Sequence, residues 1–230
     1  MSSLNHSLSR DQVRNIDACA IRELGIPGAL LMENAARGLC DILMEKLDDE
    51  PHPRVLIVCG TGNNGGDGLA LARLLSANGR SASTVIVDDG KLLQGDAELN
   101  ERILMNAGLF PNRTSPEQLG LVLGQLNESD WVVDALLGTG LTGPPREPYR
   151  SVIHAINRCS ARVLSVDLPS GMNCDTGEAL ETCVKADETV SFVARKRGFD
   201  HPAATSLTGR IHVCHIGLPL EWLSQHINAS

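Results

Sequence analysis

Three loops of this chain combine glycines with asparagine, aspartate and serine, which are side chains able to bind phosphate or to move protons. The first loop, GTGNNGGDG at 60–68, directly follows the apolar run VLIVC. The second comprises Asp134 within the run WVVDALL and the segment GTGLTGPPREPY after it. The third comprises Asp167 and LPSG, which follow RVLSV. Because ligands of parallel α/β sheets bind beyond the carboxyl ends of the strands, we expect the three loops to form one site.

The first loop has the composition of a phosphate-binding turn. Gly60, Gly62 and Gly65 spell G-x-G-x-x-G. Glycines let the backbone approach a ligand closely, and the helix that follows offers unpaired N–H groups. A P-loop is excluded, because Asp67 stands where the Walker lysine would follow the glycines. Two alternatives stay open, since the segment could be a tight turn without a ligand and Asp67 could merely cap the helix.

The other two loops add a second possible nucleotide-binding segment and a possible cation site. Residues 138–144 would wrap a second phosphate or a ribose, or else form a surface connection. Asp134 lies within an apolar run, where a carboxylate is costly unless it is paired, protonated or bound to a cation. Together with Asn64 and Ser170 it offers hard oxygen ligands. A single carboxylate favours a monovalent ion such as potassium, although an ordinary buried polar network would use the same residues.

Asp167 is the first candidate for acid–base catalysis. It could instead hydrogen-bond only its own turn, but its place beside the other two loops favours catalysis. Farther along, Arg195, Lys196 and Arg197 follow the fifth apolar run. This basic cluster would either meet phosphates at the same edge of the sheet or form a solvated surface.

Composition and charge exclude several classes of protein. The chain has 230 residues, 42% of them hydrophobic, and can bury a sizeable core. A formal net charge of -8 with 3% aromatic residues argues against nucleic-acid or anionic-membrane partners. The start MSSLNHSLSR does not resemble a signal peptide, and no apolar run approaches the roughly 20 residues that span a bilayer. Seven cysteines without a C-x-x-C pair are typical of reduced thiols, so we expect a cytoplasmic protein.

The spacing of apolar residues predicts an α/β fold. Two amphipathic helices, at 11–24 and 29–47, come first. Six apolar runs follow: VLIVC, STVIVD, WVVDALL, RVLSVDL, TVSFVA and RIHVCHI. Helical stretches near 69–77, 96–106, 116–126 and 149–157 lie between them. This alternation predicts a mostly parallel sheet with helices on both faces, in one domain over 1–230 with a helical extension (1–50) and an α/β core (54–217).

Four segments, in this order, carry a family resemblance: GTGNNGGDGLALAR, VDALLGTGLTGPPREPY, VDLPSGMNCDTGE and ADETVSFVARKRG. They strongly resemble the YjeF N-terminal domain family. The similarity extends to RNIDACAIRELGIPGALLMENAA near the start and to TGRIHVCHIGLP near the end, so that it covers nearly the whole chain. It implies a Rossmann-like three-layer α/β/α sandwich, commonly as a homodimer. It also implies an NAD(P)H-hydrate epimerase, an isomerase that interconverts the R and S forms of hydrated NADH and NADPH at C6.

The resemblance further implies a role in metabolite repair, in which an S-specific dehydratase restores the coenzyme. Many members are fused to that dehydratase domain, which this chain lacks, so we expect the dehydratase to be a separate protein. The substrate is then a small dinucleotide. The sequence does not separate a preference for hydrated NADH from one for hydrated NADPH.

Carried over by position, the resemblance also assigns roles to single residues. It places the hydrated nucleotide on Asn63, Asn64, Gly65, Gly66 and Asp67. It assigns a second nucleotide-binding segment to Gly138, Thr139, Gly140, Leu141, Thr142, Gly143 and Pro144. It implies that Asp167 faces the substrate and that Asn64, Asp134 and Ser170 bind potassium. For proton transfer Asp167 is the first choice and Asp67 the second, whereas RKRG matches the family's K-x-G only loosely and Lys196 stays outside the site.

Two other functions compete with the epimerase interpretation. An NAD(P)-dependent oxidoreductase would use the G-x-G-x-x-G loop and Asp88, which ends the second strand where a ribose-binding acid could sit. However, no substrate domain follows, and the other two loops would have no role. A non-catalytic nucleotide-binding or protein-interaction module is the third possibility. The presence of Asp67, Asp134 and Asp167 favours catalysis over such a module.

Overall fold

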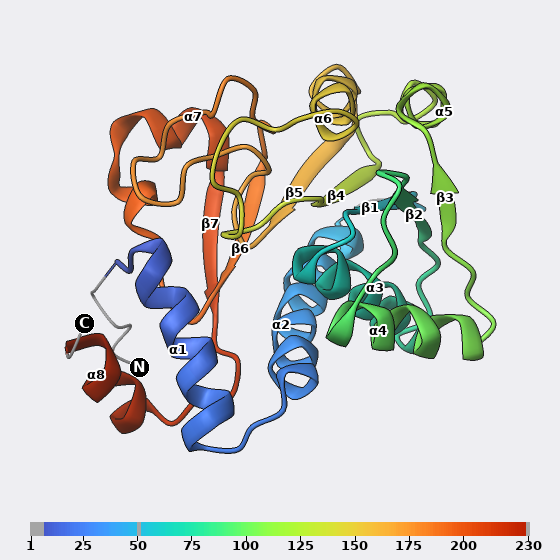
Figure 1. The fold of residues 1–230 in the computed structure, drawn as a ribbon. Helices are drawn as coiled ribbons and strands as arrows, with labels where there is room; N and C mark the ends of the chain where they lie inside the picture. The colour runs from blue at the N-terminus through green and yellow to red at the C-terminus, as the bar shows by residue number, and fades with distance from the viewer. Residues whose placement is uncertain (1–6, 50–51, 229–230) are drawn as a thin grey trace.

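The computed structural model describes residues 7–49 and 52–228. Its centre is a seven-stranded sheet in the order β3-β2-β1-β4-β5-β6-β7 (Figure 1). Every neighbouring pair of strands is parallel. The strands are β1 (Val55–Cys59), β2 (Ser83–Val87), β3 (Asn112–Thr114), β4 (Trp131–Ala135), β5 (Arg162–Val166), β6 (Glu188–Phe192) and β7 (Arg210–Cys214). The α/β fold and the Rossmann-like architecture predicted from the sequence are therefore confirmed.

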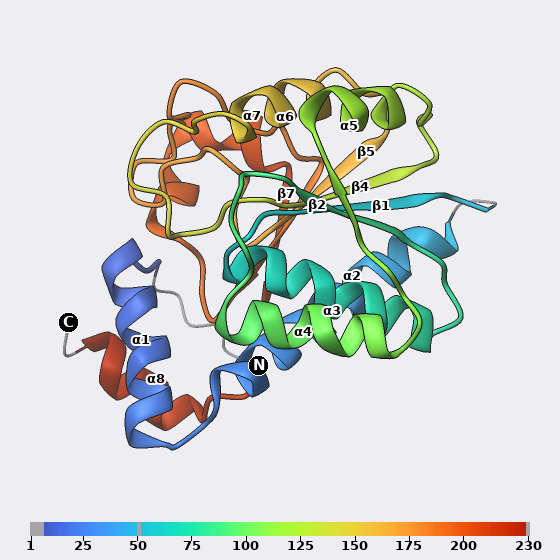
Figure 2. The same ribbon diagram turned by 45° about the vertical axis from the view of Figure 1, so that its right-hand side comes forward.

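Helices cover both faces of the sheet, which makes three layers (Figure 2). One layer holds α2 (Gly28–Asp48), α3 (Asn63–Ala77) and α4 (Gly95–Asn106). The other holds α5 (Pro116–Leu123), α6 (Tyr149–Ile156) and the short α7 (Thr205–Thr208). Near α7 lie two 3-10 helices, η1 (Arg197–Asp200) and η2 (Pro202–Ala204). None of the helices in these described residues is both long and apolar enough to cross a bilayer.

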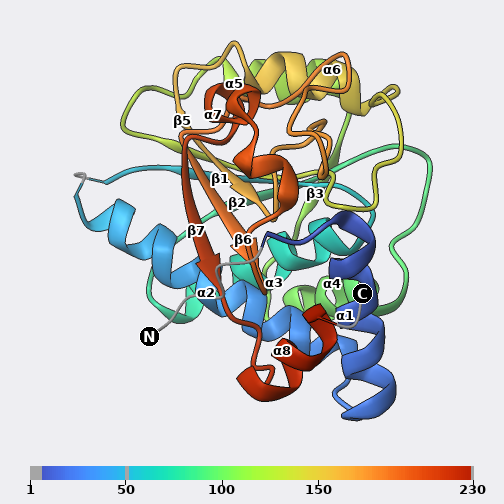
Figure 3. The ribbon, with the colours of Figure 1, turned by 90° about the vertical axis from the view of Figure 1, so that its left-hand side faces the viewer.

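The terminal helices α1 (Arg10–Glu23) and α8 (Leu220–Asn228) pack against each other beside the sandwich (Figure 3). Ser9 begins α1 with a capping box, in which its hydroxyl accepts from the Gln12 amide and its own amide donates to the Gln12 side chain. Directly before this cap, the backbone of Leu8 is hydrogen-bonded to the chain on both sides of Lys196. The first helix is therefore fixed to the sheet at its N-terminus and to α8 along its length.

The strand order places the predicted loops together for a physical reason. β1 pairs with β2 on one side and with β4 on the other, so that the connections after β1 and β4 leave in different directions. Such a switch point opens a crevice beyond the carboxyl ends of the strands. All five residues of β1 and all five of β4 are buried, as is typical of central parallel strands. The apolar runs VLIVC and WVVDA thus locate the crevice.

Several boundaries differ from the prediction. Helix α3 starts at Asn63, six residues before the predicted start at 69, because the glycines of the loop form its first turn instead of a separate phosphate loop. The predicted strands after β1 run one or two residues too far at their carboxyl ends, because the chain turns away there. The sequence did not predict β3, because its residues, Asn-Arg-Thr, are polar and lie at the edge of the sheet. Helix α8 lies beyond residue 217, where the predicted core ends.

Candidate functional site

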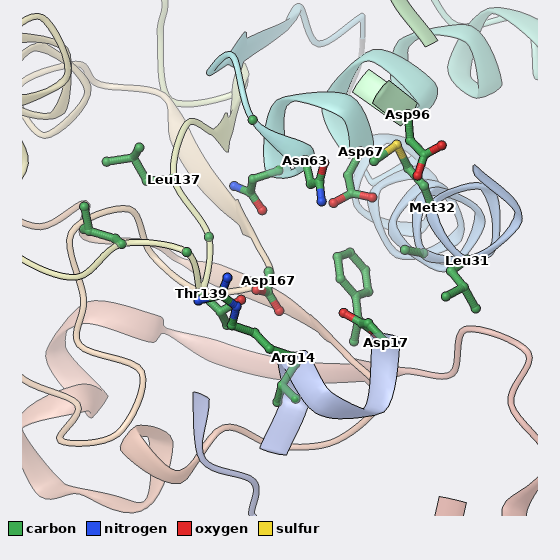
Figure 4. Close-up of a pocket in the computed structure, with 18 of the residues that line it drawn as sticks. Arg14, Asp17, Leu31, Met32, Asn63, Asp67, Asp96, Leu137, Thr139 and Asp167 are labelled. Carbon is green, nitrogen blue, oxygen red and sulfur yellow. The ribbon is translucent and has the colours of Figure 1, made fainter. Parts of the chain in front are cut away.

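A cavity of about 600 Å³ opens at the carboxyl edge of the sheet (Figure 4). The loops after β1, β4 and β5 all border it, as the sequence predicts. Helices α1 and α2 and the chain after β6 complete its walls. The volume lies in the range of pockets that hold small molecules and cofactors.

The β1 loop places the N-terminus of α3 at the cavity. Gly62 is the N-cap and provides no side-chain cap, so the first amides of the helix and its positive dipole end are available to an anion. Asn63, Asn64 and Asp67 border the cavity. Gly65 and Gly66 do not border it: Gly65 packs on the Gly60 carbonyl and Gly66 packs against α2 and α4.

The two halves of the predicted β4 loop have different positions. Its first four residues, Gly138, Thr139, Gly140 and Leu141, border the cavity. Thr142, Gly143 and Pro144 lie outside the cavity wall. A Cβ on Gly138 would lie 3.1 Å from Asn64 Oδ1 and 3.4 Å from Asp167 Oδ2, so this backbone passes close to both side chains. The loop therefore brings its first half, and not its whole length, to the site.

Asp167 lies in a strained turn directly after β5. Its φ of 67° is in the left-handed region, which costs a non-glycine residue about 1–3 kcal/mol. The Leu168 amide closes the turn by donating to the Val166 carbonyl at 2.8 Å, and the Asp167 amide donates to the Val190 carbonyl at 2.8 Å. Strain of this kind persists only where surrounding contacts impose it. Here those contacts leave the Asp167 side chain at the wall of the cavity (Figure 4).

Lys196 is the ionic partner of Asp167. Its side chain is fully buried, and Nζ lies 2.8 Å from Asp167 Oδ1 and donates to the Phe192 carbonyl at 3.0 Å. Between Phe192 and Lys196, Val193 has a φ of 70°, which is a clear outlier for a β-branched residue. Two strained turns, one after β5 and one after β6, thus bring an aspartate and a lysine together. The sequence analysis left Lys196 outside the site; its signals were the basic cluster after the fifth apolar run and the loose K-x-G match.

Two further carboxylates face the same cavity. Burial raises the pKa of Asp67 well above 3.8, and the charges of Asp167 and Asp17 raise it further. The pKa of Asp17 on α1 is raised to about 6, chiefly by burial, with Lys196 lowering it and Asp167 raising it. Burial therefore favours the protonated form of Asp67, whereas Asp17 titrates close to neutrality. Asp17 escaped the sequence reasoning because its helix is distant in sequence from the three loops.

Asp134 and Ser170 form one buried hydrogen-bonded group next to the cavity wall. The Asp134 carboxylate accepts from the Ser170 hydroxyl at 2.6 Å, the Ser170 amide at 2.9 Å and the Ser165 hydroxyl at 2.8 Å. These donors are neutral, and no described Lys, Arg or His side chain forms an ion pair with Asp134. Burial therefore raises the pKa of Asp134. A buried carboxylate without a cationic partner is the setting in which a bound cation is favourable.

Asn64 adds an amide oxygen to the polar atoms beside this group. Its Nδ2 atom is buried without a hydrogen-bond partner among the described residues. Its Oδ1 faces Gly138, and the adjacent Leu137 amide donates to the Ser170 hydroxyl at 2.9 Å. The Ser170 hydroxyl can also donate to the Leu137 carbonyl at 3.2 Å, which would leave Asp134 Oδ1 with the Leu136 amide at 3.3 Å as its donor. The amide, carboxylate and hydroxyl oxygens fit a hard monovalent cation.

A polar group at the end of β2 also borders the cavity and was missed from the sequence. Asp89 accepts from the Tyr149 hydroxyl at 2.9 Å and from the Thr61 hydroxyl at 3.0 Å, and Lys91 Nζ lies 3.6 Å away. These bonds to the charged form lower the pKa of Asp89 against the opposing effect of burial. Asp88, the acid that an oxidoreductase would need, is exposed and outside the cavity wall.

Comparison with known proteins adds independent information on this chain. Residues 28–198 match the family model described as YjeF-related protein N-terminus. A protein of Rhodopirellula baltica named NAD(P)H-hydrate epimerase is 42% identical over 214 residues, which are 93% of this chain and 85% of the relative. One of the same name from Pirellula staleyi is 39% identical over 224 residues, covering 96% and 97%.

Longer relatives and a solved structure agree with this assignment. A protein of Dictyoglomus turgidum named bifunctional NAD(P)H-hydrate repair enzyme Nnr is 30% identical over 97% of this chain, which spans 42% of that protein. The crystal structure of yeast ynu0 superposes with a TM-score of 0.78 over 96% of this chain and 93% of the yeast chain, at 20% identity. That likeness shows the same fold. The family model spans more than half of the chain and the two epimerases match over nearly their full length, so this protein belongs to the YjeF-related N-terminal family.

Proposed function

We propose that this protein is an isomerase that epimerises the R and S forms of hydrated NADH and NADPH at C6 of the nicotinamide ring. The observation that carries the proposal is the Asp167–Lys196 ion pair, held by two strained turns at the wall of a nucleotide-sized cavity. The N-terminus of α3 at the same cavity supplies donors for the substrate's phosphates. Two relatives of nearly the same length bear the name of this activity.

The reaction needs proton transfer and no hydride acceptor. A carboxylic acid protonates the C6 hydroxyl, the C6–O bond breaks, and the lone pair of the ring nitrogen forms a planar iminium as water leaves. Water then adds to the opposite face, and a carboxylate takes the proton from it. Asp167, ion-paired with Lys196, suits the carboxylate role. Burial raises the pKa of Asp67, which favours its protonated form and suits a hydrogen-bond donor to the substrate.

Substrate contacts follow from the cavity wall. Asn63, Asn64 and the first amides of α3 would hold one end of the dinucleotide, and residues 138–141 would hold it from the β4 side. Gly65 and Gly66, which do not border the cavity, would support binding indirectly, because their lack of a side chain lets the first turn of α3 pack closely against Gly60 and against helices α2 and α4. For residues 142–144, which lie outside the wall, a role in binding requires the loop to close over the substrate.

We further propose that potassium binds to Asn64, Asp134 and Ser170. The support is the buried Asp134 carboxylate without a cationic partner and the Asn64 amide oxygen, which faces the backbone of Gly138. The ion would supply positive charge that neutralises Asp134 and fixes the β1, β4 and β5 loops relative to one another. Those loops carry Asp67, Gly138 and Asp167, so ion binding would order the cavity wall.

Four finer points also belong to this proposal. The product S form would be consumed by a dehydratase, consistent with the name of the longer bifunctional relatives. Both hydrated NADH and hydrated NADPH would be accepted. A homodimer stays a prediction, which sedimentation of the purified protein tests. A cytoplasmic location likewise stays a prediction, tested by fractionation of cells.

The proposal is tested by epimerisation of purified R-form hydrated NADH, coupled to an S-specific dehydratase and followed by the absorbance of NADH. The wild type should accelerate the R-to-NADH phase. Asp167→Asn should lower turnover by about 10²–10⁴-fold while KM changes little, because general acid–base catalysis contributes that much. Asp41→Asn, the same change at an exposed position on α2, is the matched control.

Two results would overturn parts of this proposal. Near-normal turnover of Asp167→Asn would remove Asp167 from the reaction. A folded, potassium-loaded wild type without acceleration would reject the epimerase, and nucleotide binding without turnover would then favour a non-catalytic module. Redox turnover with NAD or NADP would instead favour an oxidoreductase.

A further inference from the structure

The backbone of Leu8, directly before helix α1, fixes the start of that helix beside the Asp167–Lys196 ion pair. The Leu8 amide donates to the Arg195 carbonyl at 2.8 Å, and the Arg197 amide donates to the Leu8 carbonyl at 2.8 Å. These two bonds flank Lys196 on both sides. The capping box of Ser9 then starts the helix, and the Arg10 amide donates to the Asp175 side chain at 2.9 Å. The start of α1 is therefore positioned by the same segment that supplies Lys196.

Two turns farther along, α1 presents Asp17 to the cavity. Val13, Arg14, Asp17 and Ile21 lie on one stripe of the helix and all border the cavity. Asp17 comes from α1, Asp67 from the first turn of α3 and Asp167 from the end of β5, so that the three carboxylates enter from different walls (Figure 4). No described side chain forms an ion pair or hydrogen bond with Asp17. Its carboxyl group is thus free to meet a ligand.

The negative charges around Asp17 mean that its ionised carboxylate destabilises the folded state. Three carboxylates, those of Asp17, Asp67 and Asp167, share this cavity with Lys196, which already pairs with Asp167. Arg14 on the same helix also borders the cavity. Like charges in a partly buried site repel one another, and an unpaired buried carboxylate adds a desolvation cost. Such an arrangement is typical of functional sites rather than of structural networks.

Epimerisation makes a specific demand that this arrangement meets. The hydroxyl leaves from one face of the ring and water enters from the other, so proton-transfer groups are needed on both faces. We propose that Asp17 is a catalytic residue that transfers the proton on the face of the substrate ring opposite to Asp167. This inference rests on the proposed epimerase function. In one direction Asp17 gives its proton to the leaving hydroxyl while Asp167 accepts a proton from the entering water, and the reverse direction exchanges the two roles.

Asp17 suits this role better than Asp67 does. Asp67 borders the cavity but is more deeply buried than Asp17, and burial raises its pKa well above the usual value, which favours a hydrogen-bond donor over a group that changes its proton. Asp17 is partly exposed at the cavity, and its pKa of about 6 allows both protonation states near neutrality. The groups that set this value from the neighbouring elements are Lys196 and Asp167.

The test compares Asp17→Asn with Asp17→Glu in the coupled epimerisation assay. Asp17→Asn should lower kcat by about 10²–10⁴-fold with KM nearly unchanged, and Asp17→Glu should restore part of the rate. In the wild type, kcat should fall at alkaline pH because Asp17 loses its proton. This fall should be missing in Asp17→Asn and present in Asp17→Glu. Asp11→Asn, the same change at an exposed position of the same helix, is the control.

A stability measurement separates catalysis from a structural role. Removal of one negative charge from the carboxylate cluster relieves repulsion, so Asp17→Asn should melt at the same temperature as the wild type or higher. Loss of turnover together with lower stability would indicate a structural role and overturn the inference, as would wild-type turnover in Asp17→Asn. An active wild type with an active Asp17→Asn rejects only this inference, whereas an inactive wild type rejects the proposed function itself.

Discussion

The variant Lys196→Met isolates what the buried ammonium does. Methionine keeps an unbranched side chain out to Cε but removes the Nζ atom, which is the partner of Asp167 at 2.8 Å and the donor to the Phe192 carbonyl at 3.0 Å. Removal of one member of a buried ion pair costs about 3–5 kcal/mol. Because Asp167 borders the cavity and its side chain is 13% exposed, water replaces part of the lost interaction. We therefore expect a loss near the lower limit, about 3 kcal/mol.

This loss is large enough to measure by thermal unfolding. In a chain of 150–250 residues, 1 kcal/mol corresponds to about 2–4 °C in Tm, so Lys196→Met should lower Tm by about 6–12 °C. The double variant Lys196→Met/Asp167→Asn removes both charges and should be more stable than Lys196→Met. Circular dichroism melts of the wild type, both single variants and the double variant complete the cycle.

The same four melts show whether the ion pair stabilises the site at all. A Lys196→Met protein that melts within about 1 °C of the wild type, with no coupling to Asp167→Asn in the double variant, would show that the ion pair does not stabilise the site. Turnover supplies a second readout, because the unpaired Asp167 is no longer held in position. Lys196→Met should therefore lose kcat even at temperatures where circular dichroism shows it to be fully folded.

Three further predictions follow from other parts of the structure. Gly65→Ala should destabilise the fold strongly, because the new Cβ would overlap the Gly60 carbonyl. Gly62→Ala has open space around its Cβ and should lower the free energy of unfolding by less than about 1 kcal/mol. Urea unfolding of both variants tests this difference. Potassium titrated into ion-free protein should raise turnover, and Asp134→Asn should remove the response. Hydrogen exchange should show α8 most protected near pH 5.5 and less protected at pH 8.5. The pKa of His226 is raised above 6.5 by the Trp222 carbonyl and by Glu23. Protonated His226 therefore stabilises α8 fully below pH 6.5, and this stabilisation is lost as pH rises through the raised pKa. Equal protection of α8 at the two pH values would contradict this prediction.

Glu23, the partner of His226, sets the lower limit of the pH range in which this ion pair stabilises α8. The pKa of Glu23 is lowered by Arg22 and by His226, so its contribution is present above 4.5 and lost as pH falls through the lowered value. Glu23 Oε2 lies 2.8 Å from His226 Nε2 and joins α1 to α8. His226→Ala should therefore remove the difference between pH 5.5 and pH 8.5.

Much of the fold follows from local sequence patterns. Buried parallel strands need continuous apolar runs, and VLIVC, WVVDA and RVLSV provide them at β1, β4 and β5. Alternation with helical segments then requires right-handed parallel connections, which bring the loops after these strands to one edge. Asn63, Asp67, Gly138 and Asp167 could be placed at a common cavity on that basis alone.

The tertiary structure decided which side chains act together. Asp167 and Lys196 are 29 positions apart in the chain, and their pairing depends on strained turns that no local pattern reveals. Asp17 reaches the cavity only because backbone bonds at Leu8 fix α1 beside Lys196. Burial, neighbouring charge and strain depend on contacts between distant segments, whereas strand and loop identity depends on residues close in sequence. The sequence by itself thus located the site, and only the packing of the whole chain determined its charges and its partners.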